Sequence, residues 1–252
     1  YCKIYKMLIP RVIPVLTIDN NYLVKTKKYK DPVYIGDPFN ALRIFNEKEV
    51  DEVIILDISN KRKNNPDYEF IKSLASEAFM PLCYGGHISS ISHAEKLFNI
   101  GVEKISINTA ALESIDFVKK LSEVFGSQSI VISIDVRKNI FGNYKIFHRD
   151  KNLRNVFDIE EYIYILQDLG AGELLLTPIN FDGMRNGYDL KMYENLCKNI
   201  EIPLILNGGL GCIEHIKEAY NRNFSAFAGS SMFVFHGIHQ AVLITYPERR
   251  SE

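Results

Sequence analysis

The chain has 252 residues, 46% of them hydrophobic, which is enough to enclose the core of one large α/β domain. Its 30 Lys and Arg nearly balance its 31 Asp and Glu, so a formal charge of −1 gives no electrostatic reason to expect nucleic acid or an acidic membrane as a partner. No stretch approaches the roughly 18 apolar residues of a membrane span, so we expect a cytoplasmic protein. The four cysteines lack C-x-x-C spacing, so we expect no metal site. A small molecule is the expected ligand, and no cofactor is expected.

Short apolar runs alternate with longer amphipathic ones along the chain. The runs typical of strands buried on both faces span residues 11–18, 52–58, 80–85, 104–108, 130–136, 172–179, 202–208 and 226–231. Apolar residues at i, i+3, i+4 and i+7 predict helices over residues 37–50, 90–100, 114–126, 158–170, 189–200 and 212–222. Eight strands that alternate with helices predict an α/β fold of the (β/α)8 TIM barrel type, and an open doubly wound sheet is the alternative. We expect one domain over residues 1–252, with residues 1–6 as an extension before a natural start at Met7.

The second half of the sequence repeats the first. The run IPLILNGGLGCIEHIKEA resembles MPLCYGGHISSISHAEKL, which stands about half a chain length earlier. Such a long period favours two fused half-barrels related by a pseudo-twofold axis. Two segments without clear periodicity, residues 20–37 and 138–155, follow the first and fifth expected strands, and the second contains a hairpin around Gly142. Both belong to the face where barrel enzymes place their active sites.

Glycine-rich turns end the third and seventh expected strands, in YGGHI and NGGLG. Glycine lets backbone amides approach an anion closely, and small polar residues follow the fourth and eighth strands. The repeat therefore predicts two phosphate sites for a small molecule phosphorylated at both ends. The residues expected at the first are Gly86, Asn108 and Thr109, and those at the second are Gly208, Gly209, Ser230 and Ser231, with Asp182 and Gly183 closing the second site.

Two further residues on this face have more than one interpretation. Asp135 ends the buried fifth strand, where a carboxylate needs a partner or a chemical task, so it is our candidate catalytic residue. A carboxylate that only holds a loop is the alternative. His87 either contacts a phosphate or fills space beside the first site.

Several motifs resemble the cyclase subunit of imidazole glycerol phosphate synthase, an enzyme of histidine biosynthesis. They are DEVIILDIS, GVEKISINTAA, FGSQSIVISID, GAGELLLTPINFDGMRNGYD and NGGLG, and the resemblance runs from Met7 to about Phe235. It implies a barrel whose floor binds a separate glutaminase and through which ammonia passes to the opposite face. There the family joins ammonia to a bisphosphorylated ribulosyl formimino substrate, which fits the two phosphate sites predicted from the repeat.

The resemblance also assigns roles to charged residues at the starts of the strands. The ammonia gate of the family falls on Arg11, Glu52, Lys104 and Glu173, all of the expected charge. Buried charges are costly unless they are paired, so such a ring needs a function. The alternative to an ammonia gate is a plug that only closes the floor of the barrel. Glu103 falls at the position that contacts the glutaminase, and Lys25 at that of a substrate-binding lysine.

The catalytic pair of the family is incomplete in this chain. Asp135 matches one of its two aspartates, but Thr17 stands in place of the other, and a threonine hydroxyl cannot replace a carboxylate in proton transfer near neutral pH. The glycines around Lys25 and the third glycine of the first phosphate turn, here His87, are also missing. We therefore doubt that the chain has independent cyclase activity.

An intact gate beside a broken catalytic pair indicates a diverged paralogue. The resemblance implies that such paralogues pass ammonia to a third enzyme, which amidates a nucleotide-linked sugar in surface-glycan biosynthesis. A working cyclase of histidine biosynthesis that tolerates Thr17 is the first alternative. A stand-alone isomerase of a phosphorylated aminosugar is the second, although it would need two carboxyl groups on the active face and no charged floor.

Overall fold

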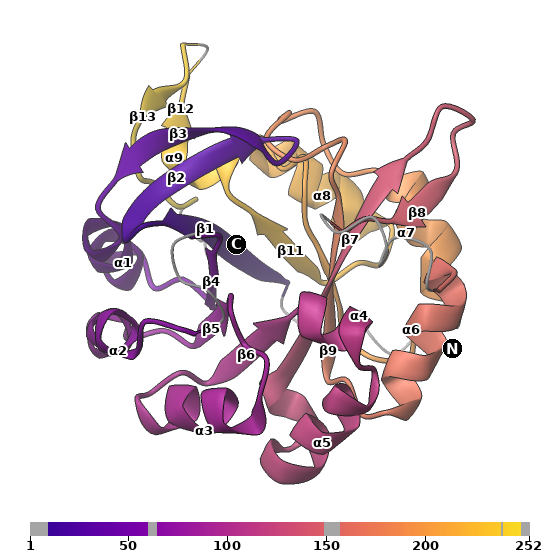
Figure 1. Cartoon of the computed structure of the whole chain (residues 1–252). Coiled ribbons are helices and arrows are strands. Elements are labelled where there is room, and N and C mark those ends of the chain that lie inside the picture. The colour runs from indigo at the N-terminus through magenta and orange to yellow at the C-terminus, as the bar shows by residue number, and fades with distance from the viewer. Residues whose placement is uncertain (1–9, 60–64, 149–156, 238, 248–252) are drawn as a thin grey trace.

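The computed structural model describes residues 10–59, 65–148, 157–237 and 239–247, and eight parallel strands of this part of the chain form a closed barrel (Figure 1). In order around the barrel they are β1 (Arg11–Asp19), β4 (Val53–Asp57), β5 (Leu82–Gly85), β6 (Lys104–Ile107), β7 (Ile130–Lys138), β9 (Glu173–Pro178), β10 (Leu204–Leu206) and β11 (Ala226–Gly229). β11 pairs with β1 in parallel, with Arg11 opposite Ala226, and this pairing closes the sheet. The predicted TIM barrel is confirmed.

Helices surround the strands (Figure 1). They are α1 (Pro38–Glu47), α2 (Tyr68–Glu77), α3 (Ile91–Asn99), α4 (Thr109–Glu113), α5 (Asp116–Phe125), α6 (Ile159–Asp168), α7 (Leu190–Leu196), α8 (Ile213–Asn221) and α9 (Ser231–Val234). Several begin at a residue whose side chain accepts a hydrogen bond from a backbone amide of the first turn, such as Asp37 before α1, Asp67 before α2 and Asp189 before α7. None of the described helices is long and apolar enough to cross a membrane.

The alternation of side chains along the strands divides the apolar core into two parts. Outward-facing residues of the strands pack against the helices in the larger cluster, which includes Leu16, Ile55 and Ile132. Inward-facing residues fill the barrel in a smaller cluster: Ile13, Val15, Ile54, Cys83, Val131, Leu175, Ile205, Ala226 and Ala228. Because successive side chains point to opposite faces of a strand, the same period of two also directs polar residues into the barrel at its two ends.

Three hairpins extend the barrel at the carboxyl ends of the strands, an end that we call the mouth. β2 (Tyr22–Lys27) and β3 (Lys30–Gly36) continue from β1, β8 (Tyr144–Ile146) pairs with β7, and β12 (Phe235–His236) pairs with β13 (Ala241–Val242). The hairpin predicted around Gly142 is confirmed, with Gly142 at φ +88°. Residues 149–155 of that predicted segment, and residues 1–9, lie outside the described residues.

The structure differs from the predicted elements in several places. Residues 20–37, expected to be irregular, form the β2–β3 hairpin, and α2, α4 and α9 lie in stretches where the sequence pattern predicts no helix. Only Ile71 and Leu74 of α2 are buried, so its apolar periodicity is weak. The helix expected over residues 189–200 ends as an α-helix at Leu196 and continues as a short 3-10 turn.

Candidate functional site

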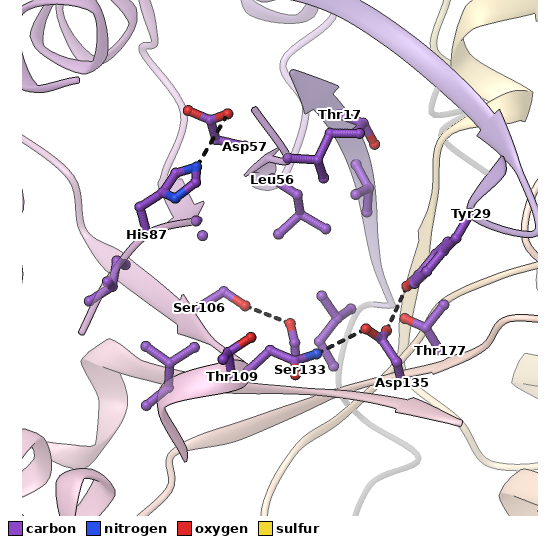
Figure 2. Close-up of a pocket in the computed structure, with 18 of the residues that line it drawn as sticks. Thr17, Tyr29, Leu56, Asp57, His87, Ser106, Thr109, Ser133, Asp135 and Thr177 are labelled. Carbon is purple, nitrogen blue, oxygen red and sulfur yellow. Dashed lines mark hydrogen bonds and ion pairs between the residues drawn. The ribbon is translucent and has the colours of Figure 1, made fainter. Parts of the chain in front are cut away.

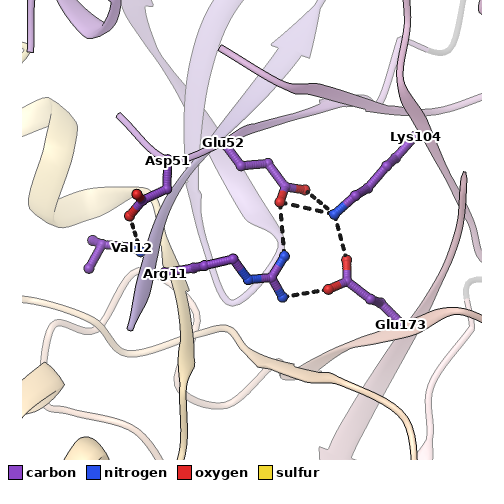
Figure 3. A network of polar contacts seen from close by, with 6 residues as sticks. All are labelled: Arg11, Val12, Asp51, Glu52, Lys104 and Glu173. Atoms are coloured by element: carbon purple, nitrogen blue, oxygen red, sulfur yellow. Dashed lines mark hydrogen bonds and ion pairs between the residues drawn. The ribbon is translucent and has the colours of Figure 1, made fainter. Parts of the chain in front are cut away.

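Four charged side chains form a closed ring at the amino-terminal ends of the strands, which we call the floor of the barrel (Figure 3). Arg11 Nη1 donates to Glu52 Oε2 at 3.1 Å, and Arg11 Nη2 donates to Glu173 Oε1. Lys104 Nζ contacts Glu52 Oε2 at 3.1 Å and Glu173 Oε2 at 2.9 Å. We call Arg11, Glu52, Lys104 and Glu173 the charged ring; the structure thus brings together all four residues predicted for the gate.

The charged ring is largely withdrawn from solvent. The side chains of Glu52 and Glu173 are 4% and 9% exposed, and those of Lys104 and Arg11 are 21% and 31% exposed. Burial raises the pKa of Glu52 even though Lys104 lies beside it. Burial also acts to lower the pKa of Lys104, but attraction by Glu52 and Glu173 outweighs it, so the pKa of this ammonium group is raised and the group stays charged near neutral pH. The ring is therefore a network of paired charges at neutral pH.

Apolar side chains lie directly above the ring inside the barrel. Cys83, Val131 and Leu175 belong to this layer, and each is at most 1% exposed. Burial, and then the negative charge of Glu52, raise the pKa of the Cys83 thiol well above its usual value, so the thiol remains neutral. The interior between floor and mouth thus carries no formal charge among these residues, an environment that favours a neutral small molecule over an ion.

A pocket with a volume of about 610 Å³ opens at the mouth of the barrel (Figure 2). Predicted site residues that line it are Thr17, Lys25, Gly86, His87, Asn108, Thr109, Asp135, Asp182 and Ser230. Side chains from β1, the β2–β3 hairpin, β7 and the loops after β5, β6 and β9 therefore meet at one cavity. Its size is in the range of pockets that enclose small molecules.

Asp135 is held on one wall of this mouth pocket. The hydroxyl of Tyr29 donates to Asp135 Oδ1 at 2.6 Å, and Asn108 Nδ2 donates to Oδ2 at 2.9 Å. Burial, followed by repulsion from Asp135 and Asp182, raises the pKa of Tyr29 well above its usual value, so the phenol stays protonated and acts as a donor. Thr17 lies across the pocket from Asp135, as Figure 2 shows. A single carboxylate, not a facing pair, occupies these two strand positions.

The turn after β5 forms one end of the mouth pocket. Gly86 has φ +132°, and a Cβ there would lie 2.6 Å from the carbonyl oxygen of Asp57, so no larger residue fits. His87 follows in the left-handed region at φ +59°, and its Nε2 lies 4.0 Å from Asp57 Oδ1. Thr109 Oγ1 lies 2.8 Å from His148 Nε2 at the same end. The first predicted phosphate site thus opens onto the main cavity.

Residues predicted for the second phosphate site also line a much smaller recess beside the mouth pocket, and Lys25, Asp182 and Ser230 line both. The lining of this recess includes Lys25, Asp182, Gly183, Gly208, Gly209, Ser230 and Ser231, and its volume is about 10 Å³. Lys25 Nζ lies 2.7 Å from Asp182 Oδ1, and their side chains are 5% and 11% exposed. The structure brings these residues together around a buried ion pair, and the phosphate site itself stays a prediction. Glu103, predicted to contact a partner, is exposed at the floor.

Several polar residues of the mouth pocket were not predicted from the sequence. Ser106 Oγ and Ser133 Oγ are 2.6 Å apart, and Asn207 Nδ2 donates to Thr177 Oγ1 at 3.0 Å. The signal for Ser133 was available, because it precedes Asp135 by two residues and a period of two places both on the inner face of β7. Tyr29 had no such signal, because it reaches the pocket only through the unpredicted hairpin. Among the described residues, no group of three or more His, Cys, Asp and Glu side chains is placed to hold a metal ion.

Comparison with known proteins agrees with this architecture. The family model described as histidine biosynthesis protein matches residues 11–239. The chain belongs to this family. Its relatives provisionally named as subunits of imidazole glycerol phosphate synthase include hisF2 of Pseudomonas aeruginosa, which is 48% identical over 94% of this chain and 96% of that protein. Subunit hisF3 of Vibrio vulnificus is 42% identical over 97% of this chain and 95% of its own length, and subunit HisF of Leptospira borgpetersenii is 40% identical over 96% of both chains. The resemblance of this histidine biosynthesis family member to the synthase cyclase subunit is thereby confirmed.

Proposed function

We propose that this chain is the synthase-type subunit of a cytoplasmic glutamine amidotransferase. In this proposal a glutaminase docks on the floor, ammonia enters through the charged ring, and a separate enzyme at the mouth uses it to amidate a nucleotide-linked sugar for a surface glycan. The observation that carries the proposal is the combination of a complete charged ring (Arg11, Glu52, Lys104 and Glu173) with a single carboxylate, Asp135, at the mouth.

The interior above the charged ring supports passage of ammonia as a neutral molecule. Val131, Leu175 and the un-ionised thiol of Cys83 line it. An ammonium ion would lose its hydration in such a layer at a cost of several kcal/mol, and the loss of hydration costs neutral ammonia much less. The ring at the entrance has two carboxylates, which attract ammonium. Its two cationic side chains pair with these carboxylates and hold them in place. This arrangement suits a gate at which ammonium is held back and ammonia passes.

Thr17 supports transfer of ammonia to another protein. A positioned acid or base contributes about 10² to 10⁴ in rate, so the loss of one carboxylate corresponds to about 3 to 5 kcal/mol of transition-state stabilisation. Asp135 is also engaged by Tyr29 and Asn108. A pocket arranged in this way is poorly equipped for cyclisation that needs both an acid and a base.

A glutaminase-binding experiment tests the proposed docking. The cognate glutaminase should bind the chain at micromolar concentration or below in calorimetry, and Glu103→Lys should weaken binding at least tenfold, because Glu103 is exposed at the floor. Glu161→Lys makes the same charge change in the first turn of α6, at the opposite end of the barrel, and should have no effect. Absence of a complex with the unmodified chain would refute docking.

A second candidate function, the cyclase reaction of histidine biosynthesis, is favoured by Asp135 and by the names of the relatives. The two functions differ in what the chain does alone with ammonium salts and the ribulosyl formimino substrate. We expect no turnover or very slow turnover. Turnover of about one per second or faster, an ordinary enzyme rate, that disappears in Asp135→Asn would establish the cyclase and exclude the conduit.

A further inference from the structure

The turn of the β7–β8 hairpin holds two large apolar side chains out in solvent. Ile140 is 93% exposed and Phe141 is 83% exposed, so neither adds to the apolar core. We call Ile140 and Phe141 the apolar tip. A single exposed apolar residue is ordinary on a protein surface, whereas a group of them marks a contact with another molecule. Most of the exposed large apolar side chains in the described part of the chain lie on the three hairpins of the mouth.

Hydrogen bonds fix the backbone that carries the apolar tip. The side chain of Asn139 accepts from the backbone amides of Phe141 at 2.9 Å and Asn143 at 3.0 Å. The side chain of Asn180, in the loop after β9, accepts from the backbone amide of Lys138 at 2.8 Å and ties the hairpin to the barrel. The turn is therefore ordered before anything binds, which lowers the entropy that association must overcome.

The β2–β3 hairpin carries a second exposed apolar group. Tyr22, Val33 and Tyr34 are each more than half exposed, and the rings of the two tyrosines pack edge to face with centroids 5.7 Å apart. This hairpin continues from β1 and the apolar tip from β7, and in the closed barrel β4, β5 and β6 separate these strands on one side and β9, β10 and β11 on the other. The two hairpins therefore rise from opposite sides of the mouth (Figure 1). A partner that contacts both covers the mouth pocket.

Positive charge accompanies the apolar groups on both hairpins. Lys27 and Lys30 stand directly opposite each other in the register of β2 and β3, Lys28 lies in the turn between them, and Lys138 is on the β7–β8 hairpin; all four are exposed. Like charges opposite each other weaken a strand pair, and Asp31 balances only one of them. The whole chain has a formal charge of −1, so this positive charge is concentrated at the mouth. It fits a partner whose contact surface is acidic.

We propose that the β2–β3 and β7–β8 hairpins form the docking surface for the enzyme that receives the ammonia, and that this partner has an apolar pocket for Ile140 and Phe141 bordered by acidic residues. The inference rests on the proposed transfer of ammonia to a separate enzyme, because a partner that contacts both hairpins separates the mouth pocket from bulk water. Tyrosine and phenylalanine are enriched in protein interfaces. A protein surface can also follow the hollow between the hairpins, whereas a flat lipid surface would contact only their outermost residues.

Binding of the purified sugar-amidating enzyme of the same organism to the full chain, with the cognate glutaminase bound, tests the proposal. Calorimetry should give a Kd in the micromolar range or below. Ile140→Ser combined with Phe141→Ser should weaken this binding at least tenfold, because anchors in a desolvated pocket dominate interface affinity, and should leave glutaminase binding unchanged. Tyr164→Ser, at a position of α6 that is 70% exposed, is the matched control and should change neither affinity.

Charge reversal provides a second, independent variant. Lys27→Glu combined with Lys30→Glu should weaken binding of the amidating enzyme at least tenfold at low ionic strength, and the loss should shrink as salt screens the charges. Lys120→Glu, at an exposed position of α5, is its control. If the double serine variant fails to fold and so does not bind the glutaminase, the lysine variant decides.

Amidation assays separate this inference from the proposed function. With all three proteins present, the double serine variant should lower glutamine-driven amidation at least tenfold and leave ammonium-driven amidation unchanged. Unchanged binding of the amidating enzyme to both double variants would overturn the docking surface and leave ammonia transfer standing, whereas no binding to the unmodified chain would overturn both. If the apolar tip instead supports a dimer of this chain in sedimentation, or binding to phosphatidylglycerol vesicles, the assigned partner is wrong.

Discussion

Tyr29 connects the tip of a hairpin to Asp135, the candidate catalytic carboxylate. Its hydroxyl lies 2.6 Å from Asp135 Oδ1, and its ring is half-buried at the edge of the mouth pocket. Hydrogen bonds to a charged group are worth about 1.5 to 3 kcal/mol when they are intact. The hydrogen bond between Tyr29 and Asp135 thus fixes both the carboxylate and the hairpin that carries Tyr29.

This contact predicts a pH dependence of folding stability. The pKa of Tyr29 is raised, mainly by burial and then by Asp135. Above pH 10 an unfolded tyrosine loses its proton while the folded one keeps it, so the folded state binds more protons and stability falls as pH rises, by up to about 1.4 kcal/mol per pH unit. In Tyr29→Phe, urea unfolding between pH 10 and 11 should show a smaller fall than in the unmodified chain. Tyr34→Phe, at a position 62% exposed on the same hairpin, should retain the full fall.

His87 gives a second prediction for a single residue. A non-glycine residue in the left-handed region, here at φ +59°, carries a cost of about 1 to 2 kcal/mol. His87→Gly should therefore be more stable than His87→Ala by about 1 kcal/mol, the reverse of the usual order of these two residues. Denaturant unfolding of the two variants measures the difference. Equal stabilities, or a more stable alanine variant, would show that this backbone conformation carries no strain.

At the scale of elements, the β2–β3 hairpin lies against the loop after β9 through Gly183. Gly183→Ala should push the hairpin away, because the new Cβ would meet the carbonyl oxygen of Thr26 at 2.6 Å. We expect a loss of about 1 to 3 kcal/mol in stability and faster amide hydrogen exchange over residues 22–36. Gly142→Ala also has a positive φ but meets no atom closer than 3.8 Å, so it should leave exchange in the β2–β3 hairpin unchanged.

The barrel strands and most helices could be predicted from the sequence because each depends on local patterns. Continuous runs of Val, Ile and Leu, as in β7, are typical of strands covered on both faces. The β2–β3 hairpin was missed for a physical reason. Asn20 and Asn21, which connect β1 to β2, have the positive φ values that asparagine tolerates, but the turn of the hairpin itself is formed by Lys28 and Tyr29 at φ +51° and +62°, residues that give no turn signal.

The candidate site was predictable to a similar extent. Residues fixed to strand ends, such as Asp135 and the charged ring, lie where the strand pattern and the family resemblance place them. The ion pair between Lys25 and Asp182 was not predictable, because these residues stand 157 residues apart and meet only through the hairpin. Pairwise contacts of this kind leave no periodic trace in a sequence.

At the scale of the whole molecule, the charged ring links strands from distant parts of the chain. Lys104→Met would leave Glu52, 4% exposed, and Glu173 close together with only Arg11 as a partner. Removing one partner from a buried ion pair costs about 3 to 5 kcal/mol, and partial exposure of Lys104 reduces this to about 2 to 4. Lys104→Met combined with Glu52→Gln should be less destabilised than the single variant, because the unpaired charge is removed.

An exposed ion pair provides the control for this prediction. Lys145 and Asp158 lie 3.4 Å apart with side chains 54% and 60% exposed, so Lys145→Met should change the free energy of unfolding by less than about 1 kcal/mol. Chemical unfolding of the variants compares the two pairs directly. If Lys104→Met costs no more than Lys145→Met, the ring contributes nothing beyond a surface pair.

The pairing of β11 with β1 has a consequence for the order of events during synthesis. β1 lies between β4 and β11, so the edge of β1 at residues 11–14 stays unpaired until the last strand has left the ribosome. Arg11 meets Glu173 across 162 residues of chain, and the sheet that fixes both side chains closes only with Ala226–Gly229. Contacts this distant in sequence slow folding. The ring at the floor is therefore one of the last features to form, and a nascent chain released before β11 would lack both a sealed barrel and the four paired charges at its floor.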